Sequence, residues 1–515
     1  MQHPRDALTI PQLILACAET YGDLPAFATR RRGAPWLPLS FRELAEKGES
    51  LAAGLMSLGV HPGEPIGILS DNRMEWILAE AGIQLCGGVS TPRGTDVTDE
   101  DLLHILDHAE VRVCFLESPR ELRRLRKLIS RLPMLRTLIL LTGDEADGES
   151  VLTLQALEAR GRDTLKKHPL LVQARMERIG PNELFTLIYT SGTTGHPKGV
   201  MLTHANMMSQ VRNTPLTLSC TDRVLSILPI WHVFERMFEM FALSQGVCTY
   251  YTSLRYLGQD LLNVEPTFMG SAPRLWESLH DKILQGVREA HPMRRLLFHT
   301  AFGIANLHHR SLRCLHGEDP EPPALPGPLQ QLRKGILALR MALLLPFYGF
   351  FNASVLEAVR LKAGGCLKAT ISGGGALPAH IDHFFTTIGI TVLEGYGLTE
   401  TSPVLAVRVP GKRVPRTVGP VIPGTEVRIV SLENGEILYP DPQHPQGGRH
   451  CRGEIQVRGP QIMLGYRNQP ELTAAVLSKD GWFRTGDIGM VTWNDCLRIL
   501  GRCKSTIVLR NGENV

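Results

Sequence analysis

The chain has 515 residues, enough for several domain-sized units and a large buried core. Its 55 Lys and Arg nearly balance its 51 Asp and Glu, so a net charge of +4 gives no support for nucleic acid as the main partner. A hydrophobic share of 43% and a charged share of 21% are typical of a globular protein. Collagen-like, disordered and coiled-coil classes are excluded.

The cysteines and the N-terminus indicate a protein of a reducing compartment. The 10 cysteines form no CxxC pair, which argues against a disulfide scaffold or a zinc module. Pro4 and Pro11 break the N-terminal segment, which is a poor signal peptide. No run of about 18 apolar residues occurs, and the nearest candidate, Gly335–Phe351, contains Arg340 and Pro346. We therefore expect a cytoplasmic protein without a membrane span.

The first part of the chain, residues 40–140, alternates helical and strand-like patterns. Residues 41–60 have apolar spacings of three and four, which predicts an amphipathic helix with Gly59 at its C-cap. Pro65–Ser70 and Val111–Leu116 are short apolar runs typical of buried strands. This alternation predicts α/β layers around a mainly parallel sheet.

Two basic regions follow. Arg120–Arg131 is amphipathic, and a solvated helix face is a better interpretation than a lipid- or partner-binding face. Leu275–Leu345 is helical, and the Pro-rich surface loop Gly317–Pro328 divides it. Its arginines and histidines lie beside the strongly apolar segment Ile336–Phe351. This segment is either a helix resting on a membrane surface, which would make the protein peripheral, or a core helix with a wet flank.

A second α/β region begins with the apolar strand Leu184–Thr190. From Arg416 the sequence is rich in turns and short strands, such as Thr425–Val430 and Gly453–Gly459, which predicts a small β-rich subdomain. We therefore expect an α/β fold with two layered α/β subdomains followed by the β-rich one. The expected boundaries are 1–180, 181–415 with a helical basic insert at 280–350, and 416–500.

The strongest motif is YTSGTTGHPKGV at Tyr189–Val200. Glycines let backbone N–H groups turn inward to form an anion nest, hydroxyls donate further hydrogen bonds, and Lys198 adds a mobile positive charge. We therefore interpret the motif as a loop that binds a polyphosphate, in preference to a plain flexible turn. The motif is not a Walker loop, because Pro197 precedes the lysine and neither Ser nor Thr follows it.

A second motif combines SGGGAL at Ser372–Leu377 with LEGYGLTETSP at Leu393–Pro403. Consecutive glycines let a flat aromatic ligand approach the backbone, although a triple glycine also marks tight bends. Tyr396 lies between two glycines, where we expect it to be exposed enough to stack on a base. Thr399 and Glu400 offer a hydroxyl and a carboxylate suited to a phosphate oxygen and to Mg²⁺.

Two further motifs carry one polar candidate each. In GWFRTGDIG, Gly481–Gly489, glycines flank Asp487 on an expected turn, where it either binds two ribose hydroxyls or makes an Asx-turn. In LPIWHVFER, Leu228–Arg236, His232 and Glu235 would share one face of a helix. A lone histidine is more often structural, and zinc is excluded because no second ligand stands at the required spacing.

In their order and spacing, these four motifs resemble the adenylate-forming superfamily, which includes acyl-CoA synthetases, luciferases and peptide-synthetase adenylation domains. The resemblance covers essentially the whole chain. The form WHxxER at Trp231–Arg236, the long insert before SGGGAL and the ending GRCKSTIVLRNGENV resemble the long-chain acyl-CoA and acyl-ACP synthetase branch. This resemblance implies a large N-terminal domain and a reaction that uses ATP and Mg²⁺ to activate a long-chain fatty acid as acyl-AMP.

The acyl group would then pass to coenzyme A or to the phosphopantetheine thiol of an acyl carrier protein. Two alternatives are a fatty acyl-AMP ligase that does not use coenzyme A, and a catalytically silent protein that binds ATP or acyl-AMP. The apolar segments Phe234–Leu243 and Val264–Leu279 are either walls of an acyl tunnel or ordinary core helices.

The resemblance also implies a role for each matching residue. The β- and γ-phosphates of ATP would be held by Thr190, Ser191, Gly192, Thr193, Thr194, Gly195 and Lys198. The adenine pocket would comprise Gly374, Gly375, Ala376, Glu394, Gly395 and Tyr396. Thr399 would contact the α-phosphate, Glu400 would bind Mg²⁺, and Asp487 and Arg502 would contact the ribose. His232 would lie beside the acyl carboxylate, and Lys504 would be the hinge to a C-terminal domain.

Members of this superfamily continue beyond the hinge into a small domain that carries the adenylation lysine. The chain stops at Val515, so we expect that C-terminal domain to be absent. Loss of one positioned cation from a charge-developing transition state typically costs on the order of 10²–10³ in rate. We therefore expect binding of ATP and fatty acid with slow turnover.

Overall fold

The computed structural model describes residues 3–30, 34–147, 150–190, 195–319, 326–441 and 448–503. The chain forms two compact units. Unit 1 consists of residues 1–257, 398–403 and 460–475, and unit 2 of residues 258–397, 404–459 and 476–515. The predicted subdomain boundaries after residues 180, 415 and 500 stay predictions.

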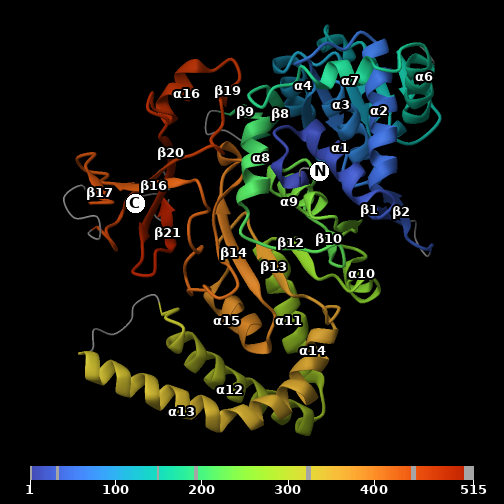
Figure 1. Cartoon of the computed structure of the whole chain (residues 1–515). Coiled ribbons are helices and arrows are strands. Elements are labelled where there is room, and N and C mark those ends of the chain that lie inside the picture. The colour runs from blue at the N-terminus through green and yellow to red at the C-terminus, as the bar shows by residue number, and fades with distance from the viewer. Residues whose placement is uncertain are drawn as a thin grey trace, which may run out of the picture. The chain divides into compact units, whose positions relative to one another are not determined.

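The main sheet of unit 1 has the strand order β19-β9-β8-β4-β3-β5-β6-β7 (Figure 1). Its parallel strands are β3 (Pro65–Leu69), β4 (Val89–Arg93), β5 (Val113–Leu116), β6 (Thr137–Leu140), β7 (Val151–Thr153) and β8 (Leu184–Thr190). Two antiparallel strands complete one edge, β9 (Lys198–Thr203) and β19 (Gly465–Tyr466). The predicted α/β fold and its early strands are confirmed.

Helices cover this sheet because each presents one apolar face. Helix α2 (Phe41–Ser57) begins at a capping box between Ser40 and Glu43, and Gly59 follows it with a φ of 85°. It packs against α3 (Met74–Leu85) and α6 (Leu154–Lys167). A separate hydrophobic core joins β3, β5, β6 and β8 to α4 (Asp99–His108) and α5 (Pro119–Arg126).

The basic stretch Arg120–Arg131 contributes to this core only through its apolar side. Leu122 and Leu125 of α5 are buried, and the guanidinium of Arg124 reaches Asp99 at 2.7 Å. Burial of the leucines beneath a charged outer side is the arrangement of an ordinary amphipathic surface helix.

The rest of unit 1 surrounds a smaller group of strands. β10 (Arg223–Ser226), β11 (Cys248–Tyr251) and β1 (Pro25–Thr29) are parallel, and β2 (Leu37–Ser40) pairs antiparallel with β1. The remaining helical segments are α1 (Ile10–Tyr21), α7 (Leu171–Met176), α8 (His204–Asn213), α9 (Val233–Ser244), the short η4 (Thr399–Thr401) and α16 (Pro470–Val476), which ends at the unit boundary.

Unit 2 holds three parallel strands, β12 (Phe268–Ser271), β13 (Ala369–Ser372) and β14 (Val392–Gly397), with β15 (Val404–Val407) antiparallel at the edge. Helices α10 (Leu257–Val264), α11 (Pro273–Glu289) and α15 (Ala379–Ile388) accompany them. The predicted β-rich part is confirmed as an antiparallel sheet ordered β17-β16-β18-β20-β21. Its strands are β17 (Ile437–Tyr439), β16 (Glu426–Val430), β18 (Gly453–Arg458), β20 (Phe483–Val491) and β21 (Leu497–Arg502).

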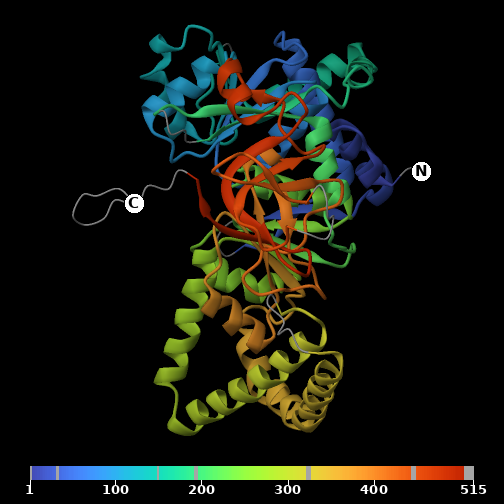
Figure 2. The same ribbon diagram turned by 90° about the vertical axis from the view of Figure 1, so that its left-hand side faces the viewer.

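The predicted helical insert of unit 2 is an extended hairpin. Helix α12 (Pro292–Leu315) lies alongside α13 (Gly327–Phe351), and the two views agree on this arrangement (Figures 1 and 2). A π-helical turn at Asn352–Leu356 and α14 (Glu357–Leu361) continue α13 without a break. None of the residues of α13 is buried, so the interpretation as a core helix is wrong.

The continuous helix Gly327–Leu361 also has the length and composition of a membrane span, and it alone does so among the described residues. Arg340 and Pro346 therefore do not interrupt the helix, and the expectation that the chain has no membrane span stays a prediction. Pro346 lies inside α13 without ending it. The Nε of Arg340 donates a 2.9 Å hydrogen bond to Oγ of Ser311 in α12, so its charge is directed at the partner helix.

Candidate functional site

The predicted phosphate loop lies at the end of β8. Thr190, the last residue of β8, pairs in register with Lys198, the first residue of β9. Gly195 has a φ of 95°, and no atom lies within 4 Å of a Cβ built on it, so only glycine suits this open, left-handed position. Ser191, Gly192, Thr193 and Thr194 lie outside the described residues. The role of the loop in holding phosphate stays a prediction.

Helix α4 supports the two strands that carry this loop, a contribution that the motif search missed. The ring of His104 donates through Nε2 to the Pro197 carbonyl at 3.0 Å and stacks on His196 with a centroid distance of 4.9 Å. One turn later, Nδ1 of His108 lies 2.8 Å from the Tyr189 hydroxyl. Burial, helped by the neighbouring charge of His104, lowers the pKa of His108. The only sequence signal was the spacing of four between the two histidines.

Lys198 and Glu400 approach the same aromatic side chain. The Nζ of Lys198 lies 5.3 Å from the centre of the Tyr466 ring, and the Tyr466 hydroxyl donates to Oε1 of Glu400 at 2.8 Å. The face of an aromatic ring attracts a cation, so Tyr466 holds Lys198 through its face and Glu400 through its hydroxyl. Burial and the Glu400 carboxylate raise the pKa of Tyr466, which keeps its proton available for this bond.

Strand pairing brings Tyr466 to this position. Tyr466 in β19 is the register partner of Val200 in β9, and the next backbone N–H, that of Arg467, donates to the Gly199 carbonyl at 2.8 Å. The N–H of Met463 donates to the Glu400 carbonyl at 2.9 Å, which ties η4 to the same segment. Sequence reasoning missed Tyr466, because only a long-range strand pair connects it with Lys198.

Thr399 and Glu400 form the first turn of η4, where Thr399 is buried and Glu400 is half-buried. Glu400 fits the predicted Mg²⁺ role in its donor type, a hard carboxylate oxygen held by a single hydrogen bond from Tyr466. Across the described residues no three His, Cys, Asp or Glu side chains form a metal cage. Mg²⁺ usually binds through one or two carboxylates together with substrate phosphates and water, so one carboxylate is sufficient.

His232 lies at the start of α9 as its N-cap, and Nδ1 accepts a 3.4 Å hydrogen bond from the Phe234 N–H. The adjacent Trp231 ring lies under the Arg93 guanidinium, 4.5 Å from its carbon. A Cβ built on Gly94 would come within 2.3 Å of Nε1 of Trp231, so the indole fits only against a glycine. Desolvation, followed by the charge of Arg93, lowers the pKa of His232, which keeps the ring neutral.

The expectation that His232 and Glu235 share a helix face is wrong. His232 precedes the helix as its cap, whereas Glu235 is fully buried inside the protein. Glu239, one turn further, is also buried and accepts hydrogen bonds from Ser226 and Tyr251, both at 2.9 Å. Burial raises the pKa of Glu239 to about 7. This polar group stabilises the packing of α9.

The segment Phe234–Leu243 lies in α9 and is mostly buried, and its role as a tunnel wall, like that of Val264–Leu279, stays a prediction. The cavity lined by Phe27, Trp76, Ile230 and Met240 has a volume of about 20 Å³. A single water needs about 10–15 Å³ by this measure, so the cavity is too small for an acyl chain.

In unit 2, Tyr396 and Arg502 converge on Asp487. The Tyr396 hydroxyl donates to Oδ2 of Asp487 at 2.6 Å, and Nε of Arg502 donates to Oδ1 at 3.0 Å. Burial, followed by the Asp487 charge, raises the pKa of Tyr396 well above its ordinary value. Asp487 is buried and pairs in register with Arg502 across β20 and β21.

Two expectations change here. Asp487 belongs to strand β20 and not to a turn, because it pairs in register with Arg502 of β21, although the register with β18 shifts between Arg484 and Ile488. The Asx-turn interpretation is also wrong, since the carboxylate accepts from distant side chains. Tyr396 is half-buried and its hydroxyl is engaged with Asp487, so it is less exposed than expected, and its stacking on a base stays a prediction.

The glycine-rich loop after β13 is open to solvent at Gly374, Gly375 and Ala376. Gly374 has a φ of 77°, and no atom approaches a Cβ built on it, whereas a Cβ on Gly375 would lie 3.7 Å from Pro273. Glu394 anchors this loop, because its Oε1 accepts from the Leu377 N–H at 3.0 Å.

The other oxygen of Glu394 pairs with Arg408 at 2.9 Å, and burial raises the pKa of Glu394. Both oxygens are therefore bonded within the protein, and Glu394 positions the loop instead of offering a free carboxylate. Gly395 lies in β14 between Glu394 and Tyr396. A Cβ built on Gly395 would make ordinary van der Waals contacts with Ile371 and Val407. The adenine role of these residues stays a prediction, and Lys504 lies outside the described residues.

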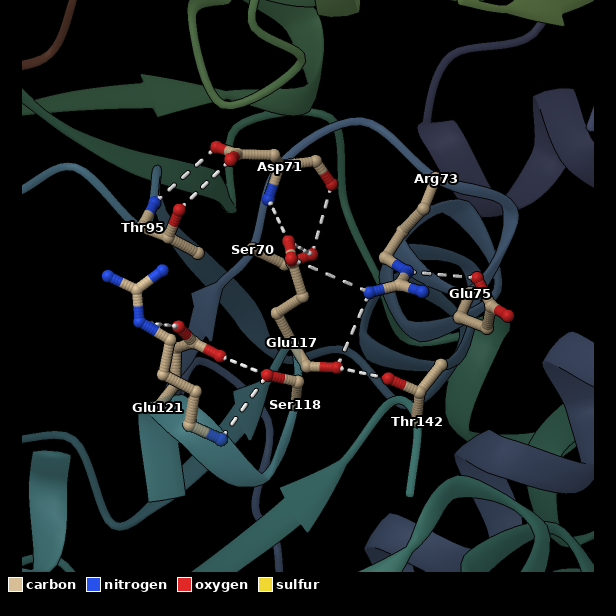
Figure 3. Close-up of polar contacts among 10 residues, drawn as sticks. Ser70, Asp71, Arg73, Glu75, Thr95, Glu117, Ser118, Glu121 and Thr142 are labelled. Carbon is tan, nitrogen blue, oxygen red and sulfur yellow. Dashed lines mark hydrogen bonds and ion pairs between the residues drawn. The ribbon is translucent and has the colours of Figure 1, made fainter. Parts of the chain in front are cut away.

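A separate polar network closes the carboxyl edge of the main sheet in unit 1 (Figure 3). Oε2 of Glu117, after β5, accepts from the Asp71 N–H at 2.8 Å and from Ser70 Oγ at 3.2 Å. Asp71 accepts in turn from the Thr95 hydroxyl, after β4, at 2.9 Å. Ligands often bind at this edge of open α/β sheets, but here the carboxylates bond to neighbouring loops and hold them together.

Comparisons with known proteins identify relatives of this chain. The sequence pattern of the family described as AMP-binding enzyme matches residues 15–467. The chain is 33% identical to the long-chain-fatty-acid–[acyl-carrier-protein] ligase AEE15 of Arabidopsis thaliana, over 98% of this chain and 71% of that protein. It is 30% identical to the long-chain-fatty-acid–CoA ligase FadD15 of Mycobacterium tuberculosis, over 93% of this chain and 72% of that protein.

Among solved structures, the N-terminal domain of FACL13 from Mycobacterium tuberculosis matches with a TM-score of 0.67 at 19% identity, over 96% of this chain and 99% of that one. FadD1 from Archaeoglobus fulgidus matches with a TM-score of 0.69 at 18% identity, over 98% of this chain and 85% of that one. These likenesses concern the fold. Together with the family pattern, which spans most of the sequence, and the relative at 33% identity, they show that this chain belongs to the AMP-binding enzyme family.

Proposed function

We propose that this chain activates a long-chain fatty acid with ATP and transfers the acyl group to a thiol. The observation that carries the proposal is the placement of Lys198 and Glu400 on one side chain, Tyr466, beside the loop that follows β8. A cation and a metal-binding carboxylate held together suit the polyphosphate of a nucleotide. The named activities of the relatives AEE15 and FadD15 support the long-chain fatty acid as substrate.

The chemistry requires two displacements. A carboxylate oxygen of the fatty acid attacks the α-phosphorus of ATP, the bond to the bridging oxygen breaks, and pyrophosphate leaves with the electron pair. The thiol sulfur then attacks the carbonyl carbon of acyl-AMP, AMP leaves, and the thiol proton passes to solvent. In the first step both reactants are anionic, and in the second step the neutral thiol is a poor nucleophile. Positioning and charge neutralisation are therefore the main demands on the protein.

The residues of unit 1 meet the demands of the first step. Lys198 binds the anionic phosphates, and the Thr399 hydroxyl donates to the α-phosphate. Bound Mg²⁺ supplies charge neutralisation on the phosphate oxygens, and Glu400 is the protein ligand for it. The neutral ring of His232 lies beside the fatty acid carboxylate, where a charged ring would trap that nucleophile in an ion pair.

The residues of unit 2 bind the nucleoside. Asp487 accepts hydrogen bonds from the ribose hydroxyls, with its orientation fixed by Tyr396 and Arg502. The open loop Gly374–Ala376 and the edge of the Tyr396 ring receive the base. A ligand that displaces the Tyr396 hydroxyl from Asp487 would free the carboxylate for both hydroxyls of the sugar.

The acceptor thiol is either coenzyme A or an acyl carrier protein, and both present the same phosphopantetheine arm. AEE15 is named for a carrier protein and FadD15 for coenzyme A, so the two acceptors are tested in parallel. Purified chain is incubated with palmitate, ATP and Mg²⁺, and acyl-AMP is measured by mass spectrometry. Either acceptor is then added, and the thioester is identified.

We expect ATP-dependent palmitoyl-AMP and one thioester. Acetate in place of palmitate should give far less adenylate, because each buried methylene contributes about 0.8 kcal/mol to binding. Adenylate without either thioester would indicate a fatty acyl-AMP ligase that uses another acceptor. Nucleotide binding without any adenylate would contradict the proposal and support a sensor of ATP.

A further inference from the structure

Helix α13 carries a stripe of large apolar side chains that the described residues of unit 2 leave exposed. Along its length they recur at spacings of three and four, which places them on one face of the helix. Each of them is more than half exposed: Leu329, Leu332, Ile336, Leu339, Leu343, Phe347 and Phe350. Monomeric proteins rarely leave so long a contiguous apolar surface in water unless it has a partner.

One flank of α13 attaches the helix to α12. Arg340 donates to Ser311 at 2.9 Å, and the Tyr348 ring stacks on His308 with a centroid distance of 4.2 Å and an interplanar angle of 5°. These contacts occur at separate points along the hairpin, so α13 is held lengthwise against α12. The apolar stripe lies beside this flank, and its side chains stay more than half exposed.

Helix α12 in turn is fixed to the body of unit 2. Phe298, Ala301 and Ala305 on its inner side are buried, and Phe302 stacks on Phe384 of α15 at 5.6 Å. The hairpin is thus packed against the body of unit 2 through α12. The outer side of α13 stays exposed to solvent.

The charged residues of the two hairpin helices are all basic, whereas the loop between them contains Glu318 and Asp319, and Asp319 pairs with Arg333 at 3.4 Å. Helix α12 contains four Arg or Lys and α13 contains three, and neither contains Asp or Glu, although the whole chain has 55 basic and 51 acidic residues. At the start of α12, Arg294 and Arg295 are exposed beside the exposed apolar residues Met293 and Leu296. Lys334 of α13 is also exposed. Cations beside an apolar face are the pattern of helices that lie on anionic lipid surfaces.

We propose that the outer face of α13, with the basic residues of the hairpin beside it, docks on the surface of an anionic phospholipid bilayer and lies in its plane. A second copy of this chain is a poorer occupant, because a two-fold contact would bring together two pairs of helices whose charged residues are all basic. A spanning orientation is also poorer, since α13 would have to leave α12 along its whole length. This inference stands independently of the proposed catalytic function.

The test uses the whole chain and two kinds of vesicle, phosphatidylcholine alone and phosphatidylcholine mixed with phosphatidylglycerol. Binding is measured by co-sedimentation, without substrates. We expect clear binding to the mixed vesicles, weaker binding to the neutral ones, and release at high salt because salt screens exposed charges. The triple variant Ile336→Gln/Leu339→Gln/Leu343→Gln should bind on the order of 100-fold more weakly.

A matched control replaces three exposed leucines elsewhere, Leu170→Gln/Leu254→Gln/Leu432→Gln, and should bind like the original chain. The variant Arg294→Gln/Arg295→Gln should lose about tenfold on mixed vesicles and little on neutral ones. All replaced side chains are exposed, and thermal melting checks that each variant folds.

Three results would overturn the proposal. Equal binding of the stripe variant and its control would exclude α13 as the docking face. A concentration-dependent dimer that the stripe variant abolishes, seen by analytical ultracentrifugation, would make a second copy the occupant. Vesicle-bound protein that resists both high salt and alkaline carbonate would indicate a spanning helix instead of one lying in the plane.

Discussion

The Tyr466 hydroxyl donates a 2.8 Å hydrogen bond to Oε1 of Glu400, which fixes the carboxylate of a residue in η4 to a residue in β19. The two residues lie far apart in sequence, and strand pairing between β19 and β9 places Tyr466 beside Lys198. Tyr466 is therefore a positioning residue, and its hydroxyl and its ring can be tested separately.

Replacing Tyr466 by Phe keeps the ring over Lys198 and removes the bond to Glu400. We expect the Mg²⁺ concentration for half-maximal adenylate formation to rise about tenfold, the effect of one lost hydrogen bond to a charged group. The rate at saturating Mg²⁺ should change little. Glu400→Gln should raise the Mg²⁺ requirement further. An unchanged requirement in both variants would remove Glu400 as the metal ligand, and unchanged melting temperatures would show that folding is intact.

Lys198→Ala should reduce the rate of pyrophosphate release from ATP by on the order of 10²–10³, because one preorganised cation is lost from the developing charge. Lys198→Arg should retain part of the rate. The control Lys166→Ala removes an exposed lysine of α6 whose amine pairs with Asp163 at 2.9 Å. If Lys198→Ala stays within twofold of the original chain, the loop after β8 does not bind phosphate.

Asp487→Asn tests the ribose contact by a change of substrate. The original chain should prefer ATP over 2′-deoxy-ATP and 3′-deoxy-ATP by about tenfold or more, and the variant should lose most of this preference. Tyr396→Phe removes one hydrogen bond to Asp487 but keeps the carboxylate, so it should discriminate nearly as well. The ratios of kcat/KM for the three nucleotides measure the effect. Equal ratios in the original chain and in Asp487→Asn would place the sugar elsewhere.

His204 makes folding stability depend on pH. It is buried, its Nδ1 accepts from the Ile10 N–H at 3.3 Å, and burial lowers its pKa from 6.5 to about 4. Below pH 6.5 the unfolded chain binds a proton that the folded chain does not, so the free energy of unfolding falls as the pH falls. The contribution of His204 between pH 7 and pH 4 is about 3 kcal/mol.

Urea unfolding at several pH values measures this slope. His204→Gln should be less stable at pH 7 and should lose about 3 kcal/mol less than the original chain on acidification. An identical slope in the two proteins would show that His204 is protonated in the folded state.

Local patterns predicted much of the fold, because strands such as β3 and β8 and the helix α2 depend on short runs of apolar residues. The same reasoning placed Lys198 in the loop after a strand, close to its position as the first residue of β9. It failed where distant pairing decides the structure: Asp487 is held in a strand by its pairing with Arg502 of β21, and Tyr466 meets Glu400 only through the β9–β19 pair.

Helix α13 shows a second kind of failure. Arg340 and Pro346 were expected to interrupt an apolar segment, but the arginine bonds to Ser311 of α12 and the proline is accommodated within the helix. A sequence pattern does not reveal which neighbour a charged side chain will reach.

The close fit of Gly94 against the Trp231 indole has a practical consequence for engineering. A single methyl group at position 94 would overlap Nε1 of Trp231, so we expect Gly94→Ala to displace the indole that adjoins His232. No charge would change and no core side chain would be truncated. If His232 lies beside the fatty acid carboxylate as proposed, a substitution at position 94 should alter acid selectivity without replacing any residue proposed to bind the nucleotide.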